Sequence, residues 1–155
     1  MEIPLFLKII LITLIPTLEL RASIPYGILR GMPWFLTFII AVIANIALGL
    51  MIYLFIEELV LLLYKIKIFK KLWHAYVERT RRKIHKFTAR YGSLAVAVFI
   101  AIPLPGSGVY SGALAAYLIG LKFKRFALAC SIGVLTAGVI VLTATVSGVA
   151  IFKAF

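Results

Sequence analysis

Glu19 and Arg21 are the best candidates for residues that do chemistry, because both are ionisable and lie inside an apolar stretch of the chain. A charged side chain at the centre of a bilayer costs at least about 2.5–3.5 kcal/mol on insertion scales. A guanidinium binds anions, and apolar surroundings disfavour the charged form of a carboxyl group. We therefore expect Arg21 to bind an anion and Glu19 to exchange protons near neutral pH. A local ion pair is the alternative, although residues two apart on a regular helix do not face each other.

A second group of candidates follows Ile102-Pro103-Leu104-Pro105. Glycine lets an anion approach the backbone closely, and a helix beginning there would direct unpaired N–H groups and its positive dipole end at that anion. Serine and tyrosine hydroxyls would add donors. The predicted substrate-binding residues are Glu19, Arg21, Gly106, Ser107, Gly108, Tyr110 and Ser111. The alternative is that the glycines form only a small-residue packing stripe.

Other chemistries have little support in the sequence. The histidines and the single cysteine, Cys130, do not form a cluster with metal-ligand spacing, and no nucleophile–base–orienter set can be drawn. We therefore expect no enzymatic activity, no metal and no cofactor.

The composition indicates an integral membrane protein of one domain. The chain has 155 residues, of which 64% are hydrophobic, its mean hydropathy is +1.13, and it contains no Asp. Its net charge of +12 could indicate a nucleic-acid partner, but in so apolar a chain anionic lipid headgroups are the expected partner.

Two broken and two unbroken apolar stretches organise the chain. Proline and glycine interrupt residues 3–29 and 93–121, whereas 34–56 and 126–152 are continuous and long enough to cross a bilayer. Backbone groups freed at such breaks must be buried in protein or line a polar cavity. Paired interruptions in two halves of a membrane chain are the best sequence indication of a transport site.

Residues 65–91 follow a different pattern. Apolar and aromatic residues recur there at spacings of three and four, with lysines and arginines between them. The pattern predicts a basic amphipathic helix on the membrane surface, anchored by Trp73 and Tyr76 and binding anionic headgroups.

Basic residues near membrane segments mark the cytoplasmic side. Residues 65–91 and the cluster Lys122–Arg125 face the same side only if 93–121 is a hairpin that enters and leaves the membrane on one side. The predicted fold is therefore all-α, with two inverted repeats. Each repeat is a re-entrant hairpin (3–29 or 93–121) followed by a transmembrane helix (34–56 or 126–152), and the basic cytoplasmic helix joins them. Because five short membrane elements bury little surface, a homodimer in the plasma or inner membrane is plausible.

Two motifs resemble those of the family of putative small multidrug export proteins. They are Glu19-Leu20-Arg21-Ala22-Ser23-Ile24-Pro25-Tyr26-Gly27, similar to E-L-R-x-x-I-P-x-G, and Ile102-Pro103-Leu104-Pro105-Gly106-Ser107-Gly108-Val109-Tyr110-Ser111-Gly112-Ala113. More distantly, the layout is similar to the DedA or VTT membrane transporter superfamily. That resemblance implies two facing re-entrant hairpins, proton-coupled transport and, for some members, translocation of polyprenyl phosphate lipids.

Three functional hypotheses remain open at this stage. The leading one is a proton-coupled transporter or flippase for a polyprenyl-phosphate-type lipid, with Arg21 holding the phosphate and Glu19 carrying the proton. The second is a proton-driven exporter of cationic drugs, in which Glu19 binds both proton and drug. The third is a membrane scaffold that uses its basic helix to gather anionic lipid.

Overall fold

A computed structural model describes residues 3–56, 58, 91–104 and 106–154, and these are organised as helices joined by short turns. The helices are α1 (Leu5–Leu14), α2 (Glu19–Leu29), α3 (Trp34–Leu54), an unlabelled helix Tyr91–Ala101, α6 (Val109–Leu118) and α7 (Phe123–Ala154). Two of them, α3 and α7, are long and apolar enough to cross a membrane. The predicted all-α membrane class is confirmed at this level. Most of the predicted basic helix 65–91 lies outside the described residues.

The first broken stretch forms a hairpin in which α1 and α2 pack against each other. Its turn is short, because α1 ends at Leu14 and α2 already begins at Glu19 and continues through Pro25. A proline inside a helix has no N–H to donate, which leaves the carbonyl of Arg21 without its usual helical partner. The two arms are also joined by a buried hydrogen bond, in which the Thr13 hydroxyl donates to Ser23 Oγ at 2.8 Å.

The second broken stretch also forms a hairpin. The helix Tyr91–Ala101 ends just before Pro103, and α6 begins after Gly108. The arms pack closely at Gly112, where an added Cβ would lie 2.5 Å from Ile100 Cγ1. Part of the predicted small-residue stripe therefore has a packing role.

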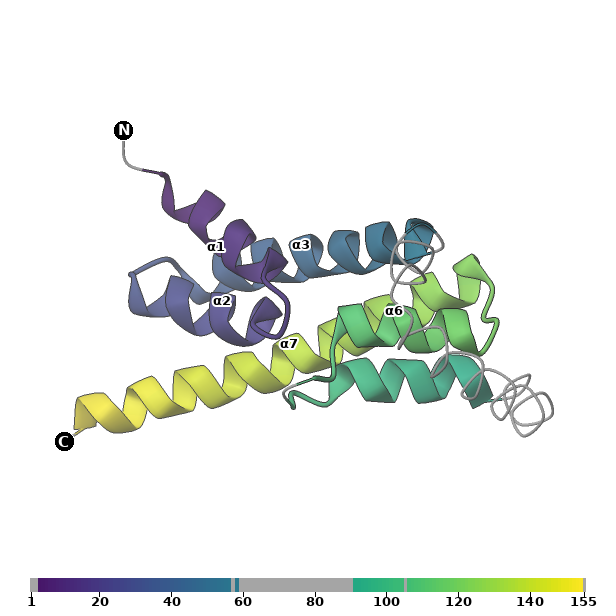
Figure 1. Ribbon diagram of the computed structural model, residues 1–155. Coiled ribbons are helices and arrows are strands. Elements are labelled where there is room, and N and C mark those ends of the chain that lie inside the picture. Colours follow the sequence, from purple (N-terminus) through teal and green to yellow (C-terminus); the bar gives the residue numbers. More distant parts are fainter. Residues whose placement is uncertain (1–2, 57, 59–90, 105, 155) are drawn as a thin grey trace.

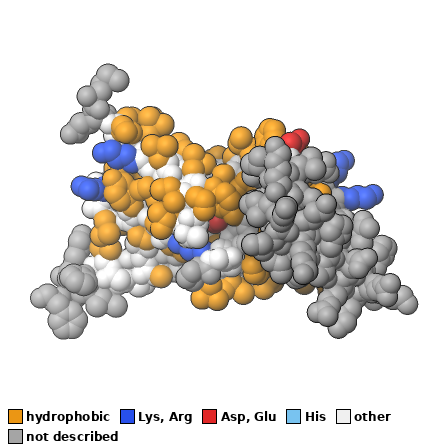
Figure 2. Space-filling view, in the orientation of Figure 1, with side chains coloured by type: hydrophobic (Ala, Val, Ile, Leu, Met, Phe, Trp, Pro, Cys, Tyr) orange, Lys and Arg blue, Asp and Glu red, His pale blue; other side chains and the backbone are white. Residues whose placement is uncertain are grey.

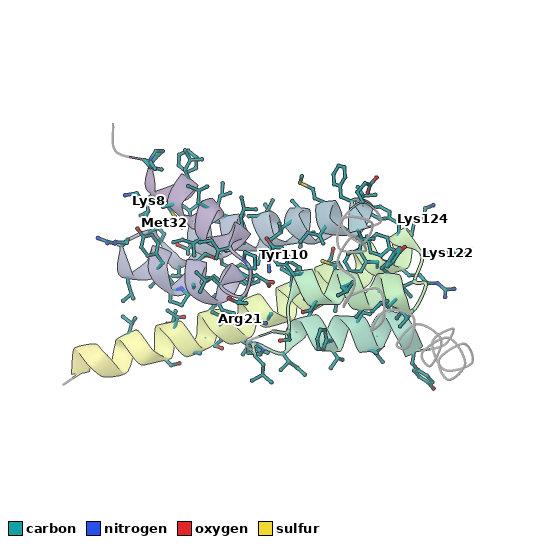
Figure 3. All side chains as sticks on the ribbon, in the orientation of Figure 1. Lys8, Arg21, Met32, Tyr110, Lys122 and Lys124 are labelled. Carbon is teal, nitrogen blue, oxygen red and sulfur yellow. The ribbon has the colours of Figure 1, made fainter. Side chains whose placement is uncertain are left out.

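The two hairpins enter from opposite ends of an antiparallel pair formed by α3 and α7, and their turns meet near its middle (Figure 1). The hairpin arms α1, α2 and α6 have 10, 11 and 10 residues. At about 1.5 Å per residue such an arm covers roughly half of a 30 Å hydrocarbon core. Lys8 and Met32 lie at one end of the molecule and Lys122 and Lys124 at the other (Figure 3).

The core fixes the start of α6 against the two long helices. Gly49 on α3 allows this approach, since a Cβ there would lie 2.8 Å from Cys130 Sγ on α7 and 3.0 Å from Val109 Cβ. Nearby, the fully buried Phe126 ring stacks on Tyr53 with 4.5 Å between the centroids. The first turn of α6 is therefore held at the centre of the molecule, where it meets the first hairpin.

Candidate functional site

The Glu19 carboxylate lies at the N-terminus of α6. Its Oε2 accepts hydrogen bonds from the backbone N–H of Val109 at 3.3 Å and from Asn45 Nδ2 of α3 at 3.5 Å. Gly108, the residue before α6, leaves room for it, since a Cβ there would lie 2.5 Å from each carboxylate oxygen. An anion at a helix N-terminus is stabilised by free N–H groups and the helix dipole. The protein's own carboxylate thus occupies the place where the sequence predicted a bound anion.

Holding Glu19 in this place costs free energy, because its charge is buried and its backbone is strained. Only 3% of the residue is exposed, and no ion pair joins it to Arg21 or to any other described residue. Its φ is +44°, and Glu19 and Thr17 are the described non-glycine residues with positive φ. The left-handed conformation costs an L-residue about 1–2 kcal/mol. Buried unpaired charge and backbone strain of this kind tend to occur at functional sites.

Arg21 ties the first hairpin to the second. Its Nη2 donates to the Ser107 carbonyl at 2.5 Å, to Ser107 Oγ at 2.9 Å and to the Ile102 carbonyl at 3.3 Å. Its Nη1 is buried and has no hydrogen-bond partner. Nη2 therefore binds the turn, while the hydrogen-bonding capacity of the buried Nη1 is unsatisfied.

A matching contact runs in the opposite direction. Tyr110, near the start of α6, donates its hydroxyl to the carbonyl of Leu14, the last residue of α1, at 2.5 Å. Arg21, near the start of α2, donates to Ile102, just after the helix Tyr91–Ala101. The second arm of each hairpin thus caps the first arm of the other.

The remaining predicted donors are used within the second turn. Ser107 Oγ bonds the carbonyls of Ile102 at 2.5 Å and Leu104 at 2.9 Å, and Ser111 Oγ donates to the Gly106 carbonyl at 2.7 Å. Gly106 has a φ of +88° and nothing within 4 Å of an added Cβ. These serines shape the turn by binding its backbone, and all seven predicted residues lie at the junction of the two turns.

A pocket of about 380 Å³ opens beside this junction. It is lined by Arg21, Pro25, Pro103, Ile140, Val141, Ala144 and Thr145. The Thr145 hydroxyl is bonded to the Val141 carbonyl at 2.7 Å, which leaves the guanidinium as the charged group of an otherwise mainly apolar wall. Figure 2 shows charged side chains near the middle of a mostly apolar surface, at the place where Figure 3 labels Arg21.

Sequence reasoning missed two parts of this site. It did not identify Asn45 as a partner of Glu19, although a lone amide in the middle of an apolar run is a usable signal. It also missed the α7 wall of the pocket, whose Ile140, Val141 and Ala144 have no feature that separates them from ordinary packing residues.

The fold and the site together define a small helical membrane protein with charged residues where two helical hairpins meet. The chain belongs to the family described as Putative small multi-drug export protein, whose family model matches residues 19–140. The matched range begins at Glu19 and includes the whole second hairpin, which confirms the resemblance noted from the two motifs. No curated protein and no solved structure matches the chain.

Proposed function

We propose that this membrane protein is a proton-coupled transporter of an amphipathic anion, and that its substrate is a lipid phosphate of the polyprenyl-phosphate type. The observation that carries the proposal is the meeting of the two turns, where Glu19 and Arg21 each bind the second hairpin but do not pair with each other. In this proposal the two charged residues have separate tasks: Arg21 binds the anion and Glu19 carries the proton.

Arg21 is the anion-binding residue in this proposal. Arg21 lines the pocket, and its Nη1 is buried without a hydrogen-bond partner. We propose that Nη1 donates to a phosphate oxygen once the junction of the two turns opens. The apolar wall on α7, with Ile140 and Val141, suits an acyl or prenyl chain beside the headgroup. A guanidinium next to an apolar wall fits an anion that carries a hydrocarbon tail.

Glu19 is the proton-carrying residue. A buried carboxylate with two long hydrogen bonds and no ion pair is expensive to keep charged, so its neutral form is accessible. Protonation would also weaken its bond to the α6 N-terminus, because a neutral carboxyl is a poorer acceptor than a carboxylate. Proton uptake and movement of the turns are thereby linked.

We further propose that both hairpins are re-entrant and that the halves are inverted repeats, with residues 65–91 on the cytoplasmic side. Half-membrane arm lengths and entry from opposite ends support this proposal. In a Cys130→Ala background, Arg30→Cys is expected to react with an impermeant maleimide in intact cells. Lys124→Cys is expected to react only after permeabilisation. Labelling of both positions from the same side would contradict the topology.

The transport proposal is tested in proteoliposomes with a fluorescent polyprenyl phosphate, whose transfer between leaflets is followed with an impermeant quencher. Wild-type protein is expected to move the probe, faster when the side from which the probe leaves is acidic. Glu19→Gln is expected to lose this response to the pH gradient, because the amide cannot carry a proton. Glu58→Gln, which changes an exposed glutamate, is the matched control and should behave as wild type. Absence of transport, or an unchanged gradient response in Glu19→Gln, would refute the proposal.

The family's description as a multidrug export protein favours a second candidate, drug export, and we take cationic drugs as its substrates. Glu19 would then bind proton and drug alternately. The pocket geometry opposes this candidate, because Arg21 places a positive charge on its wall and no described acidic residue lines it. Drug-driven proton movement in the same liposomes, lost in Glu19→Gln and retained in Arg21→Ala, would favour this candidate. The scaffold hypothesis depends on residues 65–91, most of which lie outside the described part of the chain.

A further inference from the structure

We infer that Glu19 is the resting ligand of the site that the substrate anion itself uses. On this view, which rests on the proposed function, the anion binds at the N-terminus of α6 only after Glu19 has taken up a proton and left it. Proton and anion then cross together, as symport.

The geometry at the α6 N-terminus carries the first part of this inference. The Glu19 carboxylate accepts from the Val109 N–H and fills the space that the missing side chain of Gly108 leaves. N–H donors and positive charge stabilise a carboxylate oxygen and an oxygen of phosphate or sulfonate in the same way, so either can bind at this helix N-terminus. Both cannot occupy it at once.

Asn45 provides a second and independent observation. It is 1% exposed, its Nδ2 bonds the same carboxylate oxygen as the Val109 N–H, and its Oδ1 is buried without a partner. A neutral carboxyl has the O–H donor that this acceptor lacks. A half-turn of the amide would bring Oδ1 toward Glu19, so Asn45 can pair with either form of the carboxyl group.

Charge balance at the junction supports the exchange. While Glu19 is ionised, its charge offsets that of Arg21. The carboxylate also occupies the position at the α6 N-terminus that an incoming anion would take, and it repels that anion. Once Glu19 is neutral, Arg21 and the α6 N-terminus are left without a counter-charge in apolar surroundings. Anion binding therefore favours protonation of Glu19, and by linkage protonation favours anion binding to the same degree.

The cycle is balanced in protons and charge. One proton from the entry side binds the Glu19 carboxylate, one anion binds at Arg21 and the vacated N-terminus, and both leave on the opposite side. The carboxylate then returns to Val109. A monoanion crossing in this way carries no net charge.

Among the described residues, three titratable side chains interact with Glu19. Arg21 lies on the same helix, α6 presents Tyr110, α7 presents Cys130 and α3 presents the non-titrating Asn45. Arginine, tyrosine and cysteine side chains do not ordinarily titrate between about pH 5.5 and 7.5. A pH effect in this range that disappears with Glu19→Gln is therefore assigned to Glu19.

The test measures binding of a fluorescent long-chain alkyl sulfonate to the purified full-length protein in detergent. A sulfonate keeps one negative charge throughout the pH range, so a change in affinity reports on the protein. Wild-type affinity is expected to fall about tenfold per pH unit above the midpoint of the titration, as linkage to one proton requires. Glu19→Gln is expected to bind equally well at every pH, and Glu58→Gln is expected to follow wild type.

A second measurement on wild-type protein does not depend on how any variant folds. In weakly buffered solution above the midpoint, sulfonate binding is expected to take up close to one proton per anion, read with a pH indicator. Sulfonate binding that depends on Arg21 but does not change with pH and takes up no proton would overturn this inference and leave the proposed function intact. Absence of sulfonate binding at every pH would overturn both.

Discussion

Arg21→Ala is expected to reduce lipid-phosphate transport by about a hundredfold, the largest effect of any single side-chain removal at the site. The change removes the charged group of the pocket and all three hydrogen bonds from Nη2 to the second turn. Hydrogen bonds to charged groups contribute about 1.5–3 kcal/mol each, so losing the phosphate contact alone accounts for a factor of this size. Initial rates of leaflet exchange in proteoliposomes measure it.

Two controls separate anion binding from general damage. Arg30→Ala removes an exposed arginine at the far end of α2, where it lies over the Tyr26 ring, and should leave transport near wild type. Arg21→Lys keeps the charge but not the fork of donors that spans Ser107 and the pocket, and should give an intermediate rate. Full transport activity of the Arg21→Ala protein would contradict the proposal that the guanidinium binds the substrate anion.

Gly108→Ala is expected to reduce transport at least about tenfold and to abolish sulfonate binding, whereas Gly106→Ala should keep most of both. Each glycine has a positive φ, +141° for Gly108 and +88° for Gly106, so each alanine introduces backbone strain. Only at position 108 does the new methyl group also enter the space of the Glu19 carboxylate. The same methyl group excludes an external anion, so both occupants of the α6 N-terminus are displaced.

Thermal unfolding in detergent compares the stability of the Gly108→Ala and Gly106→Ala variants. Comparable melting temperatures, combined with loss of function only at position 108, would locate the defect at the carboxylate. Equal loss of function in both variants would instead attribute the effect to strain in the turn and would contradict the role given to Glu19.

The sequence predicted the helical stretches and their interruptions well, because proline, glycine and apolar run length act locally. It treated Pro25 as one of the interruptions of residues 3–29, however, whereas α2 begins at Glu19 and continues through Pro25. A proline is tolerated in a buried or membrane helix when neighbouring helices compensate for the missing hydrogen bond. That compensation comes from tertiary contacts and cannot be read from the residues themselves.

The site was predicted as a set of residues but not as a set of contacts. In the structure the Glu19 carboxylate faces the start of α6, and Ser107 and Ser111 bind backbone carbonyls, and the sequence predicted neither of these arrangements. Which side chain reaches which partner depends on the register between two hairpins far apart in the chain. Polar type and spacing do not specify that register.

The separation of these partners along the chain has a consequence for biogenesis. Arg21 binds residues 81 and 86 positions later, and Glu19 binds a residue 90 positions later. At about 5–20 residues per second, a ribosome needs on the order of 4–18 s to make that interval. During this delay the newborn N-terminal half holds two ionisable groups whose partners in the second hairpin have not yet been made, and Glu19 has only Asn45 available to it. A nascent chain arrested before residue 102 would expose these orphaned charges, which membrane quality-control proteases could recognise.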